Sequence, residues 1–131
     1  MSEQYSGGCL CGAVRYSVDG ELREVLYCHC SQCRRQSGHY FAATNCRADD
    51  LKVEGGEHLT WFRASDTARR GFCRVCGSAL FWHGDGDEMI SVLAGSFDKP
   101  SSLKGGRHIF VADKGDYYTI DDGLPQHPQS G

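Results

Sequence analysis

The feature that most constrains this chain is the grouping of its cysteines. Seven of the eight cysteines fall in three short clusters whose members lie one or two residues apart. In chain order, the clusters are Cys9-Leu10-Cys11, Cys28-His29-Cys30-Ser31-Gln32-Cys33 and Cys73-Arg74-Val75-Cys76. Cysteines at such spacings in a tight turn can direct two thiolates at one ion, and thiolates are favoured zinc ligands. The sequence therefore predicts metal binding by these clusters.

The expected compartment also favours metal over disulfides. The first five residues are polar and lack the basic and apolar regions of a signal peptide, so we expect a cytoplasmic protein, in which thiols stay reduced. A secreted disulfide scaffold is the alternative, and it fits these spacings less well. The formal net charge of -3 argues against a nucleic-acid partner. No apolar stretch of the sequence is long enough to cross a membrane.

Two of the clusters together supply the ligands of a closed site. Cys9 and Cys11 with Cys73 and Cys76 offer four thiolates, which fill the tetrahedral coordination of zinc and give the site a structural role. Such a site would tie the N-terminal segment to the middle of the chain. Gly77 directly follows the last of these cysteines, where a turn calls for a positive φ.

The central cluster offers only three thiolates, from Cys28, Cys30 and Cys33. Catalytic zinc sites leave one corner for water or substrate, and three ligands would do so here. Spacing alone leaves alternatives open, because the triplet could share ligands with the first site or recruit Cys46 or a histidine. His29 lies between two of these ligands and is expected to point away from both sulfurs, into the surrounding shell or solvent.

Other residues near the clusters have two interpretations each. Cys46 stands alone and is expected to be a buried, inert thiol. The pair Arg34-Arg35 follows the central cluster and either compensates thiolate charge, captures an anion or lies in a solvated turn. The pair Arg69-Arg70 precedes Cys73 and has the same interpretations.

Short alternating segments punctuated by glycine predict a single, mostly β domain over residues 1–131, built as a sandwich or open barrel with little helix. A short helix is expected from a cap at Ser31 through Gln36, ending near Gly38. The tail over residues 125–131 is expected to fray. Strands are expected near 14–18 and 40–44, hairpins at 51–54 with 58–62 and at 79–83 with 89–94, and last strands at 107–112 and 117–120.

The cysteine motifs and several later segments together resemble one known family, the glutathione-dependent formaldehyde-activating enzymes, which also include centromere protein V. The resemblance extends over nearly the whole chain. The segments that carry it are Gly7-Gly8-Cys9-Leu10-Cys11-Gly12-Ala13-Val14-Arg15-Tyr16, Cys28-His29-Cys30-Ser31-Gln32-Cys33-Arg34, Phe72-Cys73-Arg74-Val75-Cys76-Gly77-Ser78-Ala79-Leu80, Gly95-Ser96-Phe97-Asp98, His108-Ile109-Phe110-Val111 and Asp122-Gly123-Leu124-Pro125.

The resemblance implies an Mss4-like fold of packed antiparallel sheets with zinc knuckles. It implies a structural zinc on Cys9, Cys11, Cys73 and Cys76. It also implies a second, open zinc site on Cys28, Cys30 and Cys33, the expected catalytic residues, at which a small thiol binds. The implied activity is that of a carbon–sulfur lyase, which joins glutathione and formaldehyde in S-(hydroxymethyl)glutathione.

Two other kinds of function remain alternatives to the lyase. In one, the zinc ions only brace a β scaffold that binds another protein, since fold alone does not settle function. In the other, the central cluster senses oxidants or zinc, because exposed thiolates of low pKa oxidise readily.

Overall fold

The computed structural model describes residues 4–130 and consists mainly of β-strands, as predicted. The smaller of two sheets has the strand order β1–β2–β5, and both pairings are antiparallel. Its strands are β1 (Gln4–Gly8), β2 (Arg15–Asp19) and β5 (Leu51–Glu54). No helix among the described residues is long and apolar enough to cross a membrane.

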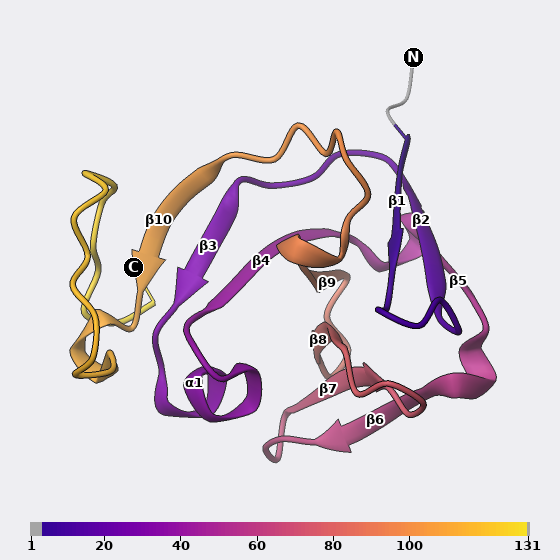
Figure 1. The fold of residues 1–131 in the computed structure, drawn as a ribbon, viewed down its shortest axis with the longest axis horizontal. Helices are drawn as coiled ribbons and strands as arrows, with labels where there is room; N and C mark the ends of the chain where they lie inside the picture. The colour runs from indigo at the N-terminus through magenta and orange to yellow at the C-terminus, as the bar shows by residue number, and fades with distance from the viewer. Residues whose placement is uncertain (1–3, 131) are drawn as a thin grey trace.

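The larger sheet has seven strands in the order β10–β3–β4–β9–β8–β7–β6, which follow an arc across the molecule (Figure 1). β10 pairs in parallel with β3, so the expectation of antiparallel sheets holds for every pair but this one. The strands are β10 (Gly105–Ile109), β3 (Val25–Cys28), β4 (Phe41–Arg47), β9 (Met89–Leu93), β8 (Ala79–Gly84), β7 (Ala68–Cys73) and β6 (Leu59–Arg63).

The main core lies between the two sheets. Tyr16 and Val18 project from one face of β2 and are almost fully buried, as their alternation predicts. Phe81 from β8 meets Tyr16 edge to face, with 5.6 Å between ring centroids. Burying one such side chain stabilises the fold by roughly 1.5–3 kcal/mol. This apolar contact holds the small sheet against the large one.

One α-helix, α1 (Ser31–Ser37), lies between β3 and β4. The predicted cap at Ser31 is wrong by one residue, because Cys30 is the N-cap and its sulfur accepts a hydrogen bond from the N–H of Cys33. The predicted end is confirmed, since Gly38 caps the helix in the left-handed conformation, with φ 86°. The helix thus begins with a cysteine of the central cluster.

The two predicted hairpins have different outcomes. β8 and β9 pair antiparallel as expected. β5 and β6 do not pair, because β5 belongs to the small sheet and β6 to the large one. Gly55, with φ 76°, begins a 3₁₀ turn over Gly56–His58 that carries the chain from one sheet to the other. The glycine pair therefore marks a crossing between sheets, which local sequence cannot distinguish from a hairpin turn.

The C-terminal segment differs from one of the two expectations for it. No strand forms at 117–120 in the described chain, where the rings of Tyr117 and Tyr118 lie against histidines. The fraying expected over residues 125–131 stays a prediction, and the described part of this tail makes backbone hydrogen bonds. The N–H of His108 donates to the carbonyl of Pro125 at 2.9 Å, and that of Val111 donates to His127 at 3.0 Å. Residues 125–129 thus lie along β10 and the turn after it.

Candidate metal centres and an adjoining cavity

Four cysteines from two turns meet where the small sheet packs against the large one. Cys9 and Cys11 lie in the turn after β1, Cys73 ends β7, and Cys76 lies in the turn before β8. Their four sulfur atoms lie within 4.8 Å of one another. The Sγ of Cys11 is 3.6 Å from that of Cys9 and 3.8 Å from that of Cys73. We call this group the four-cysteine cluster, and its donor set could hold a metal ion.

The backbone of both turns is shaped to bring these sulfurs together. Gly12 and Gly77 adopt φ values of 83° and 81°, which other residues reach only with strain. The N–H of Gly77 donates to the carbonyl of Cys73 at 2.7 Å, closing the second turn. The N–H of Leu10 donates to the hydroxyl oxygen of Ser78 at 3.0 Å, which joins the two turns. The positive φ predicted for Gly77 is confirmed.

Hydrogen bonding favours the thiolate form of one member of this cluster. Contacts with the side chain and then the backbone of Ser78 lower the pKa of Cys76 to about 5. The backbone of Ala13 lowers the pKa of Cys11, but desolvation and the neighbouring cysteines outweigh it and raise this pKa to about 11. The thiolate is the form that binds a metal, so Cys76 is ready for a cation at neutral pH and Cys11 would lose its proton on binding one.

Three further cysteines meet at the junction of β3 and α1. Cys28 ends β3, Cys30 caps α1, and Cys33 lies in its first turn, with all three sulfurs within 4.8 Å of one another. We call this group the three-cysteine cluster. Among residues 4–130, no fourth cysteine, histidine or carboxylate joins it. Cys46, considered as a fourth ligand, is instead fully buried in the main core, as expected for an inert thiol.

The three thiols of this cluster share protons unequally. Hydrogen bonds from Cys28 and then Cys33 lower the pKa of Cys30, and the backbone N–H of Cys33 adds to this effect. The pKa of Cys28 is raised, first by its hydrogen bond to Cys30. The closeness of the three sulfurs thus favours negative charge on Cys30. A bound cation would stabilise the thiolate form of all three cysteines.

A buried arginine supports the three-cysteine cluster. Nη2 of Arg70 lies 3.3 Å from the sulfur of Cys33, and Nε and Nη2 both donate to Oε1 of Gln32, at 2.9 and 2.8 Å. Arg70 is only 3% exposed and its guanidinium lies over the ring of Phe41, 4.9 Å from the centroid. Its positive charge therefore compensates thiolate charge, which was one interpretation of the Arg69-Arg70 pair.

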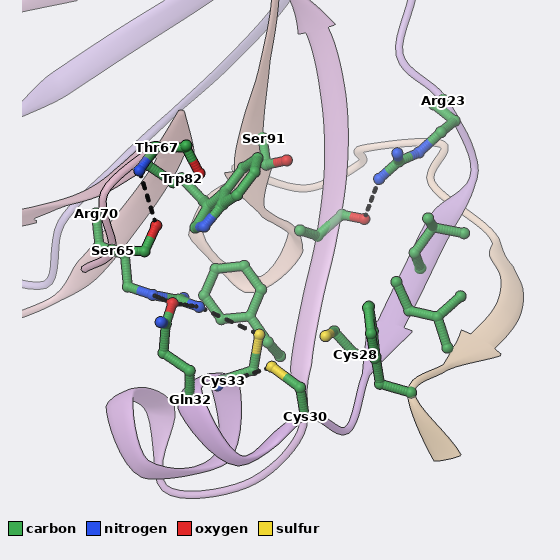
Figure 2. Close-up of a pocket in the computed structure, with 16 residues that line it drawn as sticks. Arg23, Cys28, Cys30, Gln32, Cys33, Ser65, Thr67, Arg70, Trp82 and Ser91 are labelled. Carbon is green, nitrogen blue, oxygen red and sulfur yellow. Dashed lines mark hydrogen bonds between the residues drawn. The ribbon is translucent and has the colours of Figure 1, made fainter. Parts of the chain in front are cut away.

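A cavity of about 420 Å³ opens beside the three-cysteine cluster, and none of the four-cysteine cluster lines it. Figure 2 shows the three sulfurs along one side of it and Trp82 facing them from β8. Most of the wall is apolar. The apolar lining residues include Leu26, Phe41, Ala43, Trp82, Ile109 and Phe110.

The neighbouring arginines meet only some of the expectations for them. The described lining of the cavity includes Arg23 and Arg70 but neither Arg34 nor Arg35, so the prediction of anion capture by that pair finds no support in the cavity. Arg69 lies on the opposite face of β7 from Arg70, with its guanidinium 3.9 Å from the ring of Trp61. Alternation along a strand separates these two side chains, and it is the signal that could have selected Arg70.

His29 directly follows β3, and its buried ring contacts tyrosine and histidine partners and does not join the sulfur cluster. Nδ1 of His29 lies 2.6 Å from the hydroxyl of Tyr118, and Nε2 lies 2.8 Å from Nδ1 of His108. This chain of hydrogen bonds ends at Asp122, whose carboxylate is 2.8 Å from Nε2 of His108. The side chain of His29 was expected either in the shell around the cluster or in solvent. It is fully buried, so the solvent position is excluded. These bonds fix the backbone that carries Cys28 and Cys30.

Both the sequence and the fold are similar to those of known proteins. The model of the glutathione-dependent formaldehyde-activating enzyme family matches residues 4–113, which include both cysteine clusters. The chain belongs to this family. The predicted resemblance is therefore confirmed by a match over most of the chain, although the match leaves the reaction of this member undefined.

Two relatives of the family member described here are similar over most of their length. One is an uncharacterized lyase of Schizosaccharomyces pombe, 28% identical over 116 residues, which cover 88% of this chain and 84% of the relative. The other is a candidate glutathione-dependent formaldehyde-activating enzyme of Halomonas elongata, 32% identical over 126 residues, which cover 88% of this chain and 80% of the relative.

A solved structure shares the fold of this family member. The crystal structure of a Rhodobacter sphaeroides protein superimposes with a TM-score of 0.59 and 28% sequence identity. The match covers 93% of this chain and 98% of that chain. The relatives' names support a lyase, and the two cysteine clusters are compatible with zinc.

Proposed function

We propose that this protein is a zinc-dependent carbon–sulfur lyase. It forms or cleaves an adduct in which the sulfur of a small thiol is bonded to the carbonyl carbon of an aldehyde. Glutathione and formaldehyde are the first pair to test, because the family and the Halomonas elongata relative carry their names. The observation that carries the proposal is a cluster of three cysteine sulfurs beside a cavity, because three such ligands would leave one tetrahedral position of a bound zinc ion to a substrate.

Both clusters suit zinc by the chemistry of their donors. Cys9, Cys11, Cys73 and Cys76 would enclose one ion completely and brace the two sheets. Cys28, Cys30 and Cys33 would hold a second ion with one position left for the substrate's sulfur. Zinc bound there supplies positive charge that keeps a substrate thiol in its thiolate form near neutral pH.

The chain's own residues would position the reactants. Nη2 of Arg70 donates to Cys33 and steadies negative charge on the cluster. The helix cap at Cys30 and the hydrogen bonds of His29 hold the three sulfurs in place. The cavity would hold thiol and aldehyde together, and such proximity alone can supply a large part of an acceleration.

The first test is the ratio of zinc to protein after purification under reducing conditions without chelator. A ratio near two supports both sites. A ratio near one that zinc addition does not raise contradicts the open site and favours the binding scaffold over the enzyme. Loss of one zinc equivalent on mild peroxide treatment, restored by reductant, would instead favour the sensor.

The second test addresses the reaction. Two-dimensional exchange NMR can follow formaldehyde, glutathione and S-(hydroxymethyl)glutathione at equilibrium. We expect the zinc-loaded protein to speed exchange between the free and bonded forms, and Cys30→Ser protein at the same concentration to leave the uncatalysed rate. Exchange that is equally slow in both samples would remove formaldehyde as the substrate.

A further inference from the structure

The cavity beside the three-cysteine cluster is larger and more apolar than formaldehyde needs. Its volume is about 420 Å³, whereas a cavity of roughly 150 Å³ lined by aliphatic and aromatic side chains is enough to bind benzene. The carbonyl carbon of formaldehyde carries only hydrogens. An adduct formed from formaldehyde would therefore leave most of the cavity to water. Water gains little against an apolar wall, and an apolar group would gain by displacing it.

The wall is apolar where it approaches the sulfurs. Phe41 and Ala43 are both 5% exposed and pack with Cys33 in one cluster, against which Cys28, Cys30 and Trp82 also pack. Leu26, Ile109 and Phe110 extend the lining along the edge formed by β3 and β10. Consider a substrate whose sulfur is held at the three-cysteine cluster. An organic group within a few bonds of that sulfur would contact carbon atoms of the lining on several sides.

The lining offers no partner for the ammonium group of glutathione. Glutathione carries this ammonium group beside its carboxylates, yet none of the described lining residues is acidic. The lining's cations are Arg23 and Arg70, and both already donate to protein acceptors. Only Nη1 of Arg70 is buried without a partner there, which suits one oxygen, such as the hydroxyl of an adduct. The ammonium group would lose hydration in this cavity without a carboxylate to compensate it.

We propose that this cavity selects an apolar, ring-sized organic group lying within a few bonds of the substrate's sulfur. The inference rests on the proposed function, because it places that sulfur at the three-cysteine cluster. The group could belong to the thiol itself or to the aldehyde bonded to it. In either case formaldehyde is not the best substrate for this member, and Trp82 is a specificity-determining residue.

The thiol arm of the test compares two probes by isothermal titration calorimetry of the zinc-loaded protein. Benzyl mercaptan carries the ring, and 2-mercaptoethanol offers a primary thiol without it. Burying the ring should make benzyl mercaptan bind about tenfold to a hundredfold more tightly. The aldehyde arm uses exchange NMR with glutathione, and compares phenylacetaldehyde with formaldehyde as the carbonyl partner.

The two tryptophans provide a matched pair of variants. Trp82→Leu removes a ring from the cavity, whereas Trp61→Leu removes one that packs on Phe81 outside the described lining. The preference for the ring should fall at least about fivefold in Trp82→Leu and stay unchanged in Trp61→Leu. Ala43→Leu, which fills part of the cavity, should lower the preference too, so the test does not depend on one variant folding.

Each outcome decides between the sources or against the inference. A ring preference in the thiol arm assigns the group to the thiol, and one only in the aldehyde arm assigns it to the aldehyde. The inference would be overturned if the probes with and without a ring behaved equally in both arms, or if the two tryptophan variants lost the ring preference equally. The proposed function would still stand in that case, provided that a thiol binds. If no thiol bound the zinc-loaded protein at all, the proposed function would fail first and the inference with it.

Discussion

The two cysteine clusters use the same donor atom in different surroundings. The four-cysteine cluster joins turns from both sheets, and Cys73 within it is fully buried. The three-cysteine cluster lies on consecutive elements, β3 and α1, beside an arginine and a cavity. With a zinc ion bound, the first arrangement would use every coordination position to hold the protein together, and the second would leave one position and a space for another molecule.

Two properties distinguish the roles proposed for the clusters. They are the number of cysteine ligands and the distance between these ligands along the sequence. A cluster whose cysteines are 62 residues apart closes a long loop, so its loss should unfold the protein. A cluster within six residues constrains little of the chain, so its loss should cost function before stability. Substitutions in each cluster would test this contrast.

The largest effect is expected from Cys73→Ser. The change removes a buried ligand of the four-cysteine cluster, and loss of a structural metal typically removes the folding energy it supplied. We expect the free energy of unfolding to fall by at least about 4 kcal/mol, or the protein to be recovered unfolded. Urea unfolding followed by circular dichroism measures it. A variant as stable as the parent would show that the four-cysteine cluster has no structural role.

Cys30→Ser should separate the second cluster from the first. Serine is a good N-cap, so α1 should still begin at its present position. We expect one metal equivalent and all measurable thiol binding to be lost, while unfolding free energy falls by only about 1–2 kcal/mol. Metal analysis, calorimetry with glutathione or benzyl mercaptan, and urea unfolding measure these three quantities. Unchanged thiol affinity would refute the open-site mechanism.

The sequence predicted both sets of sulfurs because metal ligation leaves a local signature. Short spacing keeps two thiolates together whatever the rest of the chain does, so Cys28, Cys30 and Cys33 need only one turn to meet. Many of the strands and the β8–β9 hairpin also follow from local patterning. However, β1, β3 and β7 were not among the predicted strands, and the strand expected at 117–120 does not form in the described chain. By contrast, local alternation could not show that β5 and β6 join different sheets, because that depends on packing elsewhere.

The cavity and the histidine chain could not be predicted, because they depend on strand order. Phe41 and Trp82 come together because β4 and β8 flank β9, which is a property of the sheet. His29 meets His108 because β10 pairs in parallel with β3, the one pairing that the antiparallel expectation missed. The described tail beyond Asp122 gains its hydrogen-bond partners along β10 and the turn after it, which the local sequence could not show.

Arg70→Gln should weaken metal binding at one cluster only. The change removes the charged donor beside Cys33, and such outer-shell partners are typically worth 10- to 100-fold in metal affinity. We expect zinc affinity of the three-cysteine cluster to fall by roughly that factor, with the four-cysteine cluster unchanged. Competition with a chromogenic chelator resolves the weaker site. Arg69→Gln is the matched control, because Arg69 lies over Trp61 instead of the cluster.

The smallest effect is expected at Cys46, the cysteine outside both clusters. Burial, with a smaller contribution from Asp50, raises the pKa of Cys46 to about 11, so the thiol stays protonated and inaccessible at pH 8. Iodoacetamide at pH 8 should leave Cys46 unmodified in the folded protein, as peptide mass spectrometry would show, and modify it after denaturation. Labelling of Cys46 at the rate of an exposed thiol would contradict this account of its environment.

Cys46→Ala extends this test to the comparison of the two clusters. The change should leave the zinc-to-protein ratio unchanged and lower the unfolding free energy by about 1 kcal/mol, because it removes one packed atom from the core. It is therefore the control for Cys73→Ser and Cys30→Ser, since all three remove one thiol. If Cys46→Ala also lost a metal equivalent, Cys46 would be the missing fourth ligand and the second cluster would be closed.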